Sequence, residues 1–331
     1  MRVALLGAAH GHIGYVLTEA RETDDVEIVA AAEPDPGMRE TFLSGMPFPV
    51  SEDPIRLLDE TEIDVAVVCG IYADRAAVAA ECLRRGVTVL ADKPLCTTWE
   101  QFEDVRAAAK ESGAHLATMF DKRFYPESVA ARRLLDDGTL GALVMVTSSA
   151  PHKLLRNRRP EWFFRRETYG SIAADLTTHD IDIVLTLTGA TSGTVSALTG
   201  RSRVEGLSEF DDHVALLLRA GDVPAAITAS WLQPDASEHH GDYRMTLVGT
   251  EGTAEIDWAV GHVTVTTHGR QTWQEPLPAR TRPVQFFFDA LRAGCTPDVT
   301  TQDTLRATEI ALLAQRSADH GGSQEVFDFG V

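Results

Sequence analysis

Short apolar runs that alternate with helical segments fill the first 120 residues, and this alternation constrains the fold more than any other feature. Strands are predicted at Arg2–Leu6, Val26–Ala32, Val65–Cys69 and Val87–Ala91. Helices are predicted between them at Ile13–Arg21, Asp53–Leu58 and Ala76–Arg85. Short apolar strands separated by helices are typical of βαβ units and of a parallel sheet that is buried on both faces. The sequence therefore predicts an α/β fold that begins with a doubly wound parallel sheet.

After residue 120 the pattern changes to β-rich and alternating runs, which favour a second, mostly antiparallel sheet. These runs are Leu143–Ser148, Thr194–Thr199, His213–Leu218, Ala225–Trp231, Arg244–Val248, Thr253–Ile256 and His262–Thr267. Helices are predicted at Ser128–Asp136, Pro283–Ala293 and Thr301–Ala318. We therefore expect two domains, 1–120 and 121–331, which agrees with about 150 residues per domain in a chain of 331.

The charge and the cysteines restrict the partners and the compartment. The chain has 49 acidic and 30 basic residues, and its net charge of −19 repels phosphate backbones and anionic lipid surfaces. We therefore expect no nucleic-acid and no membrane partner. The four cysteines include no C-x-x-C pair, which favours reduced thiols and a cytoplasmic protein. No apolar run approaches the ~18 residues that span a bilayer.

A loop of small residues, 7–14, follows the first predicted strand. A dinucleotide fold needs such residues there, because backbone amides at the N-terminus of the next helix must approach the pyrophosphate. Ala9 stands where a G-x-G-x-x-G pattern would have its first glycine, so an ordinary tight turn remains the alternative. The candidate cofactor-binding residues of this loop are Gly7, Ala9, Gly11, His12 and Ile13.

Glu33 follows the second strand, 19 residues after Gly14. An acid at this position accepts hydrogen bonds from the ribose of an adenosine and repels a 2′-phosphate. Because residues 34–38 contain no Arg or Lys, the sequence predicts NAD over NADP. The alternative is an exposed turn acid before Pro34.

His10 and His12 form an H-x-H pair that could suggest a metal. No Cys or carboxylate near them in the sequence completes a set of ligands. The small residues beside them already fit a glycine loop. We therefore expect no metal.

Asp92, Lys93 and Pro94 close the fourth strand. A lysine at the carboxyl end of a parallel strand lies at the edge where α/β proteins bind ligands, and the proline fixes the direction of the chain after it. A solvated loop lysine is the alternative for Lys93.

The segment 170–189 is predicted to be a buried helix with one polar stripe. Asp175, His179, Asp182 and Thr186 fall on that stripe, between two apolar faces. On a regular helix an aspartate at i and a histidine at i+4 are in contact, so Asp175 can orient His179 and tune its basicity. A buried ion pair without a catalytic role is the alternative.

A further segment, 153–166, holds six basic residues and one acid, with Trp162, Phe163 and Phe164 among them. The acidic balance of the whole chain disfavours nucleic acid as its partner. We expect a solvated loop, with an anionic substrate group as the alternative.

These motifs together resemble the Gfo/Idh/MocA family of NAD(P)-dependent oxidoreductases, in order and in spacing. The motifs are the glycine loop, Glu33, Asp92-Lys93-Pro94-Leu95, Asp121-Lys122-Arg123-Phe124, Trp162-Phe163-Phe164, Asp175-x-x-x-His179-x-x-Asp182 and Gly249-Thr250-Glu251-Gly252. The resemblance implies a Rossmann domain followed by an α/β domain with a large open sheet. It implies Lys93, Asp175 and His179 as catalytic residues, and it adds Ile71, Asp92, Lys93, Arg123 and Trp162 to the cofactor site.

By this resemblance we expect an NAD-dependent dehydrogenase that acts on a secondary alcohol of a sugar, cyclitol or related polyol. The expected rivals are a glycosidase that uses NAD for transient oxidation and a non-catalytic sensor that binds a dinucleotide. We also expect a homodimer or homotetramer, because the second sheet has apolar positions such as Trp231 that would need covering. The expected small-molecule partner is the polyol or sugar substrate.

Overall fold

The computed structural model describes residues 1–202 and 206–330, and these form two compact units. The first unit comprises 1–119, 167–170 and 282–308, and the second comprises 120–166, 171–281 and 309–331. A division at 119/120 lies beside the expected boundary at residue 120. The expected second domain was continuous, however, whereas in the structure two of its segments pack with the first unit. Each unit is described by itself below.

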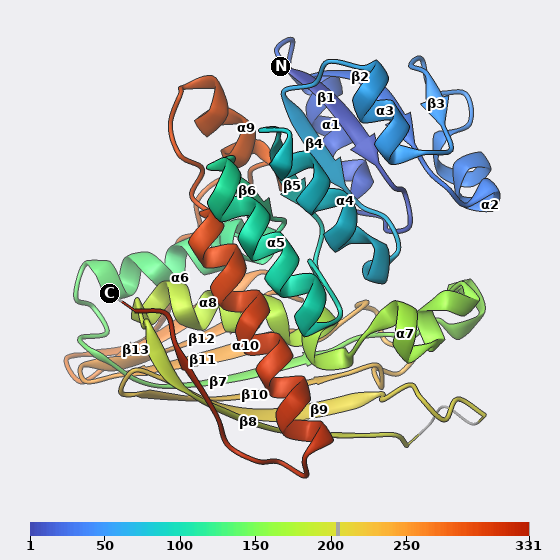
Figure 1. The fold of residues 1–331 in the computed structure, drawn as a ribbon. Helices are drawn as coiled ribbons and strands as arrows, with labels where there is room; N and C mark the ends of the chain where they lie inside the picture. The colour runs from blue at the N-terminus through green and yellow to red at the C-terminus, as the bar shows by residue number, and fades with distance from the viewer. Residues whose placement is uncertain (203–205, 331) are drawn as a thin grey trace. The chain divides into compact units, whose positions relative to one another are not determined.

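The first unit is built on six parallel strands in the order β3-β2-β1-β4-β5-β6 (Figure 1). The strands are β1 Arg2–Leu6, β2 Glu27–Ala32, β3 Val50–Ser51, β4 Val65–Val68, β5 Thr88–Ala91 and β6 Leu116–Thr118. The helices are α1 Ile13–Glu22, α2 Pro36–Met38, α3 Pro54–Glu60, α4 Tyr72–Arg84, α5 Trp99–Ser112 and α9 Gln285–Arg292. This strand order is that of a Rossmann fold, so the predicted doubly wound sheet is confirmed. The two edge strands β3 and β6 were not predicted, because runs of two and three residues are too short to show a periodicity.

The edge strand β6 is covered by the start of helix α10 (Thr301–Asp319). The backbone N–H of Leu116 donates to Oγ1 of Thr301 at 3.0 Å, and that of Thr118 donates to Oγ1 of Thr304 at 2.9 Å. Unpaired edge groups invite pairing with other chains, so these two threonines protect the sheet. This packing explains why a segment near the C-terminus belongs to the first unit.

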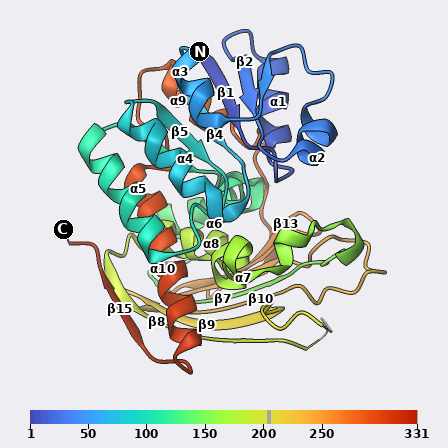
Figure 2. The same ribbon diagram turned by 45° about the vertical axis from the view of Figure 1, so that its right-hand side comes forward.

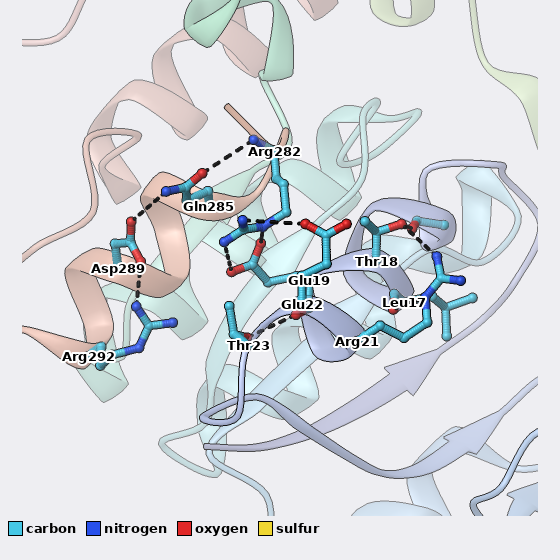
Figure 3. A network of polar contacts seen from close by, with 11 residues as sticks. Leu17, Thr18, Glu19, Arg21, Glu22, Thr23, Arg282, Gln285, Asp289 and Arg292 are labelled. Atoms are coloured by element: carbon cyan, nitrogen blue, oxygen red, sulfur yellow. Dashed lines mark hydrogen bonds and ion pairs between the residues drawn. The ribbon is translucent and has the colours of Figure 1, made fainter. Parts of the chain in front are cut away.

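An ion-pair network joins α1 to the segment that begins α9 (Figure 3). Nε of Arg282 lies 2.6 Å from Oε2 of Glu19, and Nη2 lies 3.2 Å from Oε1. The side chain of Glu19 is fully buried, whereas Glu22, 3.5 Å from Arg282, is half exposed. Because a buried carboxylate needs a charged or hydrogen-bonding partner, Arg282 is the residue that makes the burial of Glu19 tolerable.

The second unit contains a nine-stranded sheet in the order β14-β13-β12-β11-β7-β10-β9-β8-β15. The strands are β7 Leu143–Pro151, β8 Ser192–Gly200, β9 His213–Ala220, β10 Val223–Ser230, β11 Arg244–Gly249, β12 Gly252–Asp257, β13 His262–Thr267, β14 Arg270–Gln274 and β15 Glu325–Asp328. Neighbouring strands are antiparallel except β7 and β10. All seven strands predicted after residue 120 are therefore confirmed in type.

Helices cover one face of this sheet (Figures 1 and 2). Helix α6 (Pro126–Asp136) packs on β12 and β13, and α8 (Thr178–Thr188) packs on β7, β9 and β10. The backbone N–H of Ala197 on β8 donates to Oγ of Ser317, near the end of α10. The functional side chains of this unit are therefore expected on the helix-covered face.

The opposite face of the sheet carries exposed apolar side chains. Leu198, Leu217 and Val326 are each at least 60% exposed. On the two adjacent strands, Ser196 and Ala226 pair with Leu217, so the side chains directly beside Leu217 are small. The prediction that Trp231 is exposed was wrong, because its ring packs against Phe163 and Arg159 and is 5% exposed.

Two further expectations concern the whole chain. The four cysteines are free thiols, three of them buried, as the absence of a C-x-x-C pair predicted. Within residues 1–202 and 206–330, each helix is too short or too polar to cross a membrane.

The Arg282–Glu19 pair gives a prediction about stability. Arg282→Met is expected to lower the free energy of unfolding by about 2 kcal/mol, because the buried carboxylate of Glu19 loses its charged partner. Arg282 itself lies near solvent, which limits the loss. Urea denaturation measures this change. Arg292→Met is the matched control: its partners Asp25 and Asp289 are both largely exposed, so a change within about 0.5 kcal/mol is expected. Equal effects of the two substitutions would contradict this account.

Candidate active site

The first unit collects most of the predicted cofactor residues at one edge of its sheet. The loop 7–12 follows β1, Glu33 follows β2, Ile71 follows β4, and Asp92 and Lys93 follow β5. Because β2, β1, β4 and β5 are adjacent and parallel, their carboxyl ends meet at the same edge. Ligands of doubly wound folds bind at this edge. Arg123 and Trp162 belong to the second unit, so their place in a cofactor site stays a prediction.

In the glycine loop one glycine makes a close backbone contact, and two others border open space. Gly7 has a φ of +90°, and a Cβ there would lie 2.3 Å from the backbone of Gly70. Only glycine allows the ends of β1 and β4 to come so near. A Cβ at Gly11 or Gly14 would meet no described atom within 4 Å apart from its own chain neighbours. The N-terminal side of α1 therefore has room for a ligand that contacts backbone.

Glu33 is buried, not an exposed turn acid, and it is bound to the glycine loop. One carboxylate oxygen accepts the N–H of Ala8, and the other accepts the N–H of Asp35 at 2.9 Å. Burial raises the pKa of Glu33, while these two N–H groups oppose that rise. Arg39 directly follows the stretch 34–38 that contains no Arg or Lys, and its guanidinium donates to the backbone carbonyls of Glu33 and Pro34. The anionic group here is therefore the carboxylate of Glu33.

Asp92 is the centre of a polar cluster that the sequence did not predict. Its Oδ2 lies 2.9 Å from Nδ1 of His10, and its Oδ1 lies 2.8 Å from Nδ1 of His12. Its Oδ1 also accepts the N–H of Lys93 at 2.8 Å, and its Oδ2 accepts Nη2 of Arg75 at 3.1 Å. Burial alone would favour the neutral acid, but His10, Arg75 and His12 hold the pKa of Asp92 well below its usual range. Asp92 thus ties the glycine loop to the end of β5.

Arg75 completes this cluster from the first turn of α4. Its side chain is fully buried and lies 4.3 Å above the ring of Tyr72. The guanidinium donates to the carbonyls of Gly70, Lys93 and Pro94 as well as to Asp92. The chain directions at the ends of β4 and β5 are therefore fixed by one buried cation.

A carboxylate that is distant in the sequence joins His10 and His12. The ligand atoms of His10, His12 and Asp92 all lie within 4.8 Å of one another, so a carboxylate does join the pair in space. Arg75 already donates to that carboxylate, which satisfies part of its charge. Burial lowers the pKa of His10 to about 4, so its imidazole is neutral near pH 7, and this is compatible with a hydrogen bond to Asp92. The contacts within the cluster are hydrogen bonds and ion pairs around one ionised acid, and the absence of a metal stays a prediction.

The second unit places the other candidate residues on a helix that is not regular. Residues Ala173–Thr177 form a π-helical turn, and α8 continues from Thr178. The π-turn has more residues per turn than an α-helix, so the predicted i, i+4 contact of Asp175 and His179 cannot be read from a regular helical wheel. Asp175 is buried at 1% exposure, and His179 is 15% exposed.

The ion pairs that fix helix α8 were not predicted from the sequence. Lys122 Nζ lies 2.7 Å from Oδ1 of Asp180, and Arg123 forms a bidentate pair with Asp182. Asp182 was assigned to the polar stripe, and its charge is matched by Arg123. Asp180 was outside that stripe, yet it is fully buried and also accepts a hydrogen bond from Ser148. The signal in the sequence that could have indicated these pairs is the run of charged residues 121–123.

The basic segment 153–166 is only partly solvated. Arg159 lies over the rings of Phe163 and Trp231 at 4.5 and 4.9 Å, and Lys153 donates to the carbonyl of Ser237. Arg158 is exposed, as expected for a loop. An anionic substrate group for this segment stays a prediction.

Comparison with known proteins identifies both halves of the chain. The family model "Oxidoreductase family, NAD-binding Rossmann fold" matches residues 1–120, and the "GFO/IDH/MocA C-terminal domain" model matches 128–255. A scyllo-inositol 2-dehydrogenase (NAD(+)) of Bacillus subtilis is 25% identical over 97% of this chain and 95% of its own length. An inositol 2-dehydrogenase of Rhizobium meliloti is 26% identical over 96% of each chain.

Solved structures show the same fold. Levoglucosan dehydrogenase in complex with NADH has a TM-score of 0.85 at 19% identity and covers 99% of both chains. The aldose-aldose oxidoreductase of Caulobacter crescentus in complex with glycerol has a TM-score of 0.83 at 19% identity, over 98% of this chain and 99% of the other. These likenesses establish the architecture.

The cluster around Asp92 gives a second prediction. Asp92→Asn is expected to lower the free energy of unfolding by about 3 kcal/mol, because the fully buried Arg75 loses its ion pair with a carboxylate that is itself fully buried. Chemical denaturation followed by circular dichroism measures the change. In the matched control Asp104→Asn, the pair with Arg84 is exposed on both sides, and the expected change is within about 0.5 kcal/mol. A loss at Asp92 no larger than at Asp104 would show that the cluster is dispensable.

Proposed function

The chain belongs to the Gfo/Idh/MocA family of oxidoreductases, and from this premise we propose that it is an NAD-dependent dehydrogenase of a secondary alcohol in a cyclitol, sugar or related polyol. One observation carries the proposal. The edge of the first sheet holds the buried acid Glu33 after β2 and Lys93 after β5, and the second unit holds the partly exposed His179 beside the carboxylate of Asp121. The inositol dehydrogenases among the relatives support the substrate class.

The residues at the edge of the first sheet fit a dinucleotide. The open space at Gly11 and Gly14 allows backbone amides at the start of α1 to approach a pyrophosphate. The carboxylate of Glu33 has lone pairs left to accept ribose hydroxyls and would repel a 2′-phosphate, which favours NAD over NADP. Bound NAD supplies the hydride acceptor.

The remaining chemistry falls to three side chains. We assign to His179 the removal of the hydroxyl proton, to Lys93 the stabilisation of the developing alkoxide, and to Asp175 a supporting role toward His179. A positioned general base typically contributes about 10²–10⁴ in rate, and a cation matters most where negative charge develops. Proton removal at oxygen makes the carbon–hydrogen bond a better hydride donor.

A panel of inositols and sugars tests the proposal when it is assayed with NAD at the NADH absorbance. Formation of NADH in proportion to oxidised substrate is expected. Turnover of a glycoside without net NADH would instead identify an NAD-using glycosidase, and NAD binding without any turnover would identify a dinucleotide sensor.

Substitutions of the three side chains give a prediction about catalysis. His179→Ala is expected to lower kcat by about 10²-fold or more while NAD still binds, because the proton acceptor is lost and the glycine loop is untouched. Lys93→Met and Asp175→Asn are expected to act on the same step, so that combined losses are much smaller than the product of the single ones. Steady-state kinetics and melting temperatures on the same preparations measure both effects. A folded His179→Ala enzyme with normal kcat would exclude this mechanism.

We also propose that the chain forms a homo-oligomer through the uncovered face of its nine-stranded sheet. Leu198, Leu217 and Val326 are all exposed on this face, whereas exposed apolar residues of a monomer are usually scattered singly. Sedimentation is expected to show a species larger than 36.0 kDa, and Leu217→Arg is expected to shift it toward the monomer. Val260→Arg, at an equally exposed valine in the turn after β12, is the matched control and is expected to change nothing. A wild-type monomer at micromolar concentration would refute the oligomer.

A further inference from the structure

Three consecutive charged residues of one short turn face charged residues of helix α8. The turn is the 3₁₀ segment η2 (Asp121–Phe124), which opens the second unit. Lys122 pairs with Asp180 and Arg123 with Asp182, as described above. Asp121 faces His179, with 3.8 Å between Oδ1 and Nδ1. The signs of the two rows are therefore complementary when His179 is protonated.

The two cation–carboxylate pairs fix the turn against the helix. Both are almost fully buried, and Lys122 also lies 3.8 Å from the centre of the Trp258 ring. Separating a buried pair leaves an uncompensated charge, so the turn cannot slide along α8 without a large loss of stability. The position of Asp121 relative to His179 is thus set by its two neighbours in the sequence.

The carboxylate of Asp121 is held in a defined orientation. The hydroxyl of Tyr125 donates to Oδ2 at 2.8 Å, which directs the other oxygen toward His179. Asp121 is 5% exposed and His179 is 15% exposed. Water therefore screens the interaction of the two groups only weakly. A distance of 3.8 Å is too long for a good hydrogen bond but is within the range of an ion pair.

Other ionisable groups lie around this part of α8. Lys122 and Asp180 are paired with each other, and Asp175 lies in the π-turn that precedes α8. Burial, together with the charges of Asp121 and Asp180, raises the pKa of Tyr243, so its phenol stays neutral near pH 7. Among these groups, the carboxylate of Asp121 faces His179 within ion-pair distance, at 3.8 Å.

We propose that Asp121 is a positioning residue whose carboxylate stabilises the protonated form of His179 during the reaction. This inference rests on the proposed function for the role of His179. In the proton-transfer step the O–H bond of the substrate breaks and an N–H bond forms on the imidazole, while Asp121 keeps its negative charge. The i, i+4 spacing in the sequence predicts only Asp175 as the acid that orients His179.

The test is the titration of His179 in Asp121→Asn. Asparagine keeps the size of the side chain and an oxygen for Tyr125 but removes the charge. NMR of enzyme labelled with ¹³C-histidine follows each imidazole, and the His179 signal is the one absent in His179→Ala. The titration midpoint of His179 is expected to fall by about one pH unit, since an opposite charge at this distance shifts a midpoint by about one to three units. The acid limb of kcat/KM is expected to move to lower pH by the same amount.

Two further variants keep the result unambiguous. Asp121→Ser removes the same charge in a smaller side chain and is expected to give the same shift if Asp121→Asn does not fold. Asp136→Asn removes an exposed acid from α6 in the same unit and is expected to leave the midpoint unchanged. A shift smaller than about a third of a unit in a folded Asp121 variant would overturn the proposal, even if its melting temperature fell.

The outcome is separable from that of the proposed function. The NMR titration needs neither substrate nor turnover, so it reports on the Asp121–His179 pair even if His179→Ala keeps its activity. Conversely, a catalytic loss in His179→Ala together with an unchanged midpoint in Asp121→Asn would leave the dehydrogenase proposal standing and remove only this inference.

Discussion

Burying an ionised side chain is unfavourable unless another group pairs with it, and both units of this protein are organised by that constraint. In the first unit Asp92 and Arg75 are both fully buried and are paired with each other. In the second unit Lys122 and Arg123 pair with two aspartates of α8. Each set joins the end of one element to the start of another. Within each unit, these buried pairs fix the position of the elements that carry the candidate functional residues.

The same pairing explains why the candidate functional groups lie where they do. Asp92 bonds to His10 and His12 within the loop that is proposed to receive the dinucleotide, and the chain passes directly from Asp92 to Lys93. The pairs between η2 and α8 leave His179 as the partly exposed member of an otherwise buried row. The proposed base thus lies next to two buried ion pairs.

The sequence was sufficient for the features that depend on periodicity and on local motifs. The alternation of apolar strands and helices predicted the parallel sheet, and the β-rich runs predicted the second sheet. The features that were missed depend on contacts between distant segments. Each of these contacts joins residues that are far apart in the chain. They are the pair of Asp180 with Lys122, the hydrogen bond of Glu33 with Ala8, and the packing that buries Trp231. The π-turn at 173–177 could not be anticipated, because a helical wheel assumes one constant period.

Isotope transfer tests the proposed hydride transfer most directly. A polyol oxidised in the substrate panel would be prepared with deuterium on its carbinol carbon and incubated with NAD and the enzyme. Mass spectrometry of the reduced cofactor is predicted to show one deuterium per molecule, located at C4 of the nicotinamide. Reduced cofactor without deuterium, or oxidised product formed without reduced cofactor, would contradict direct hydride transfer from the substrate.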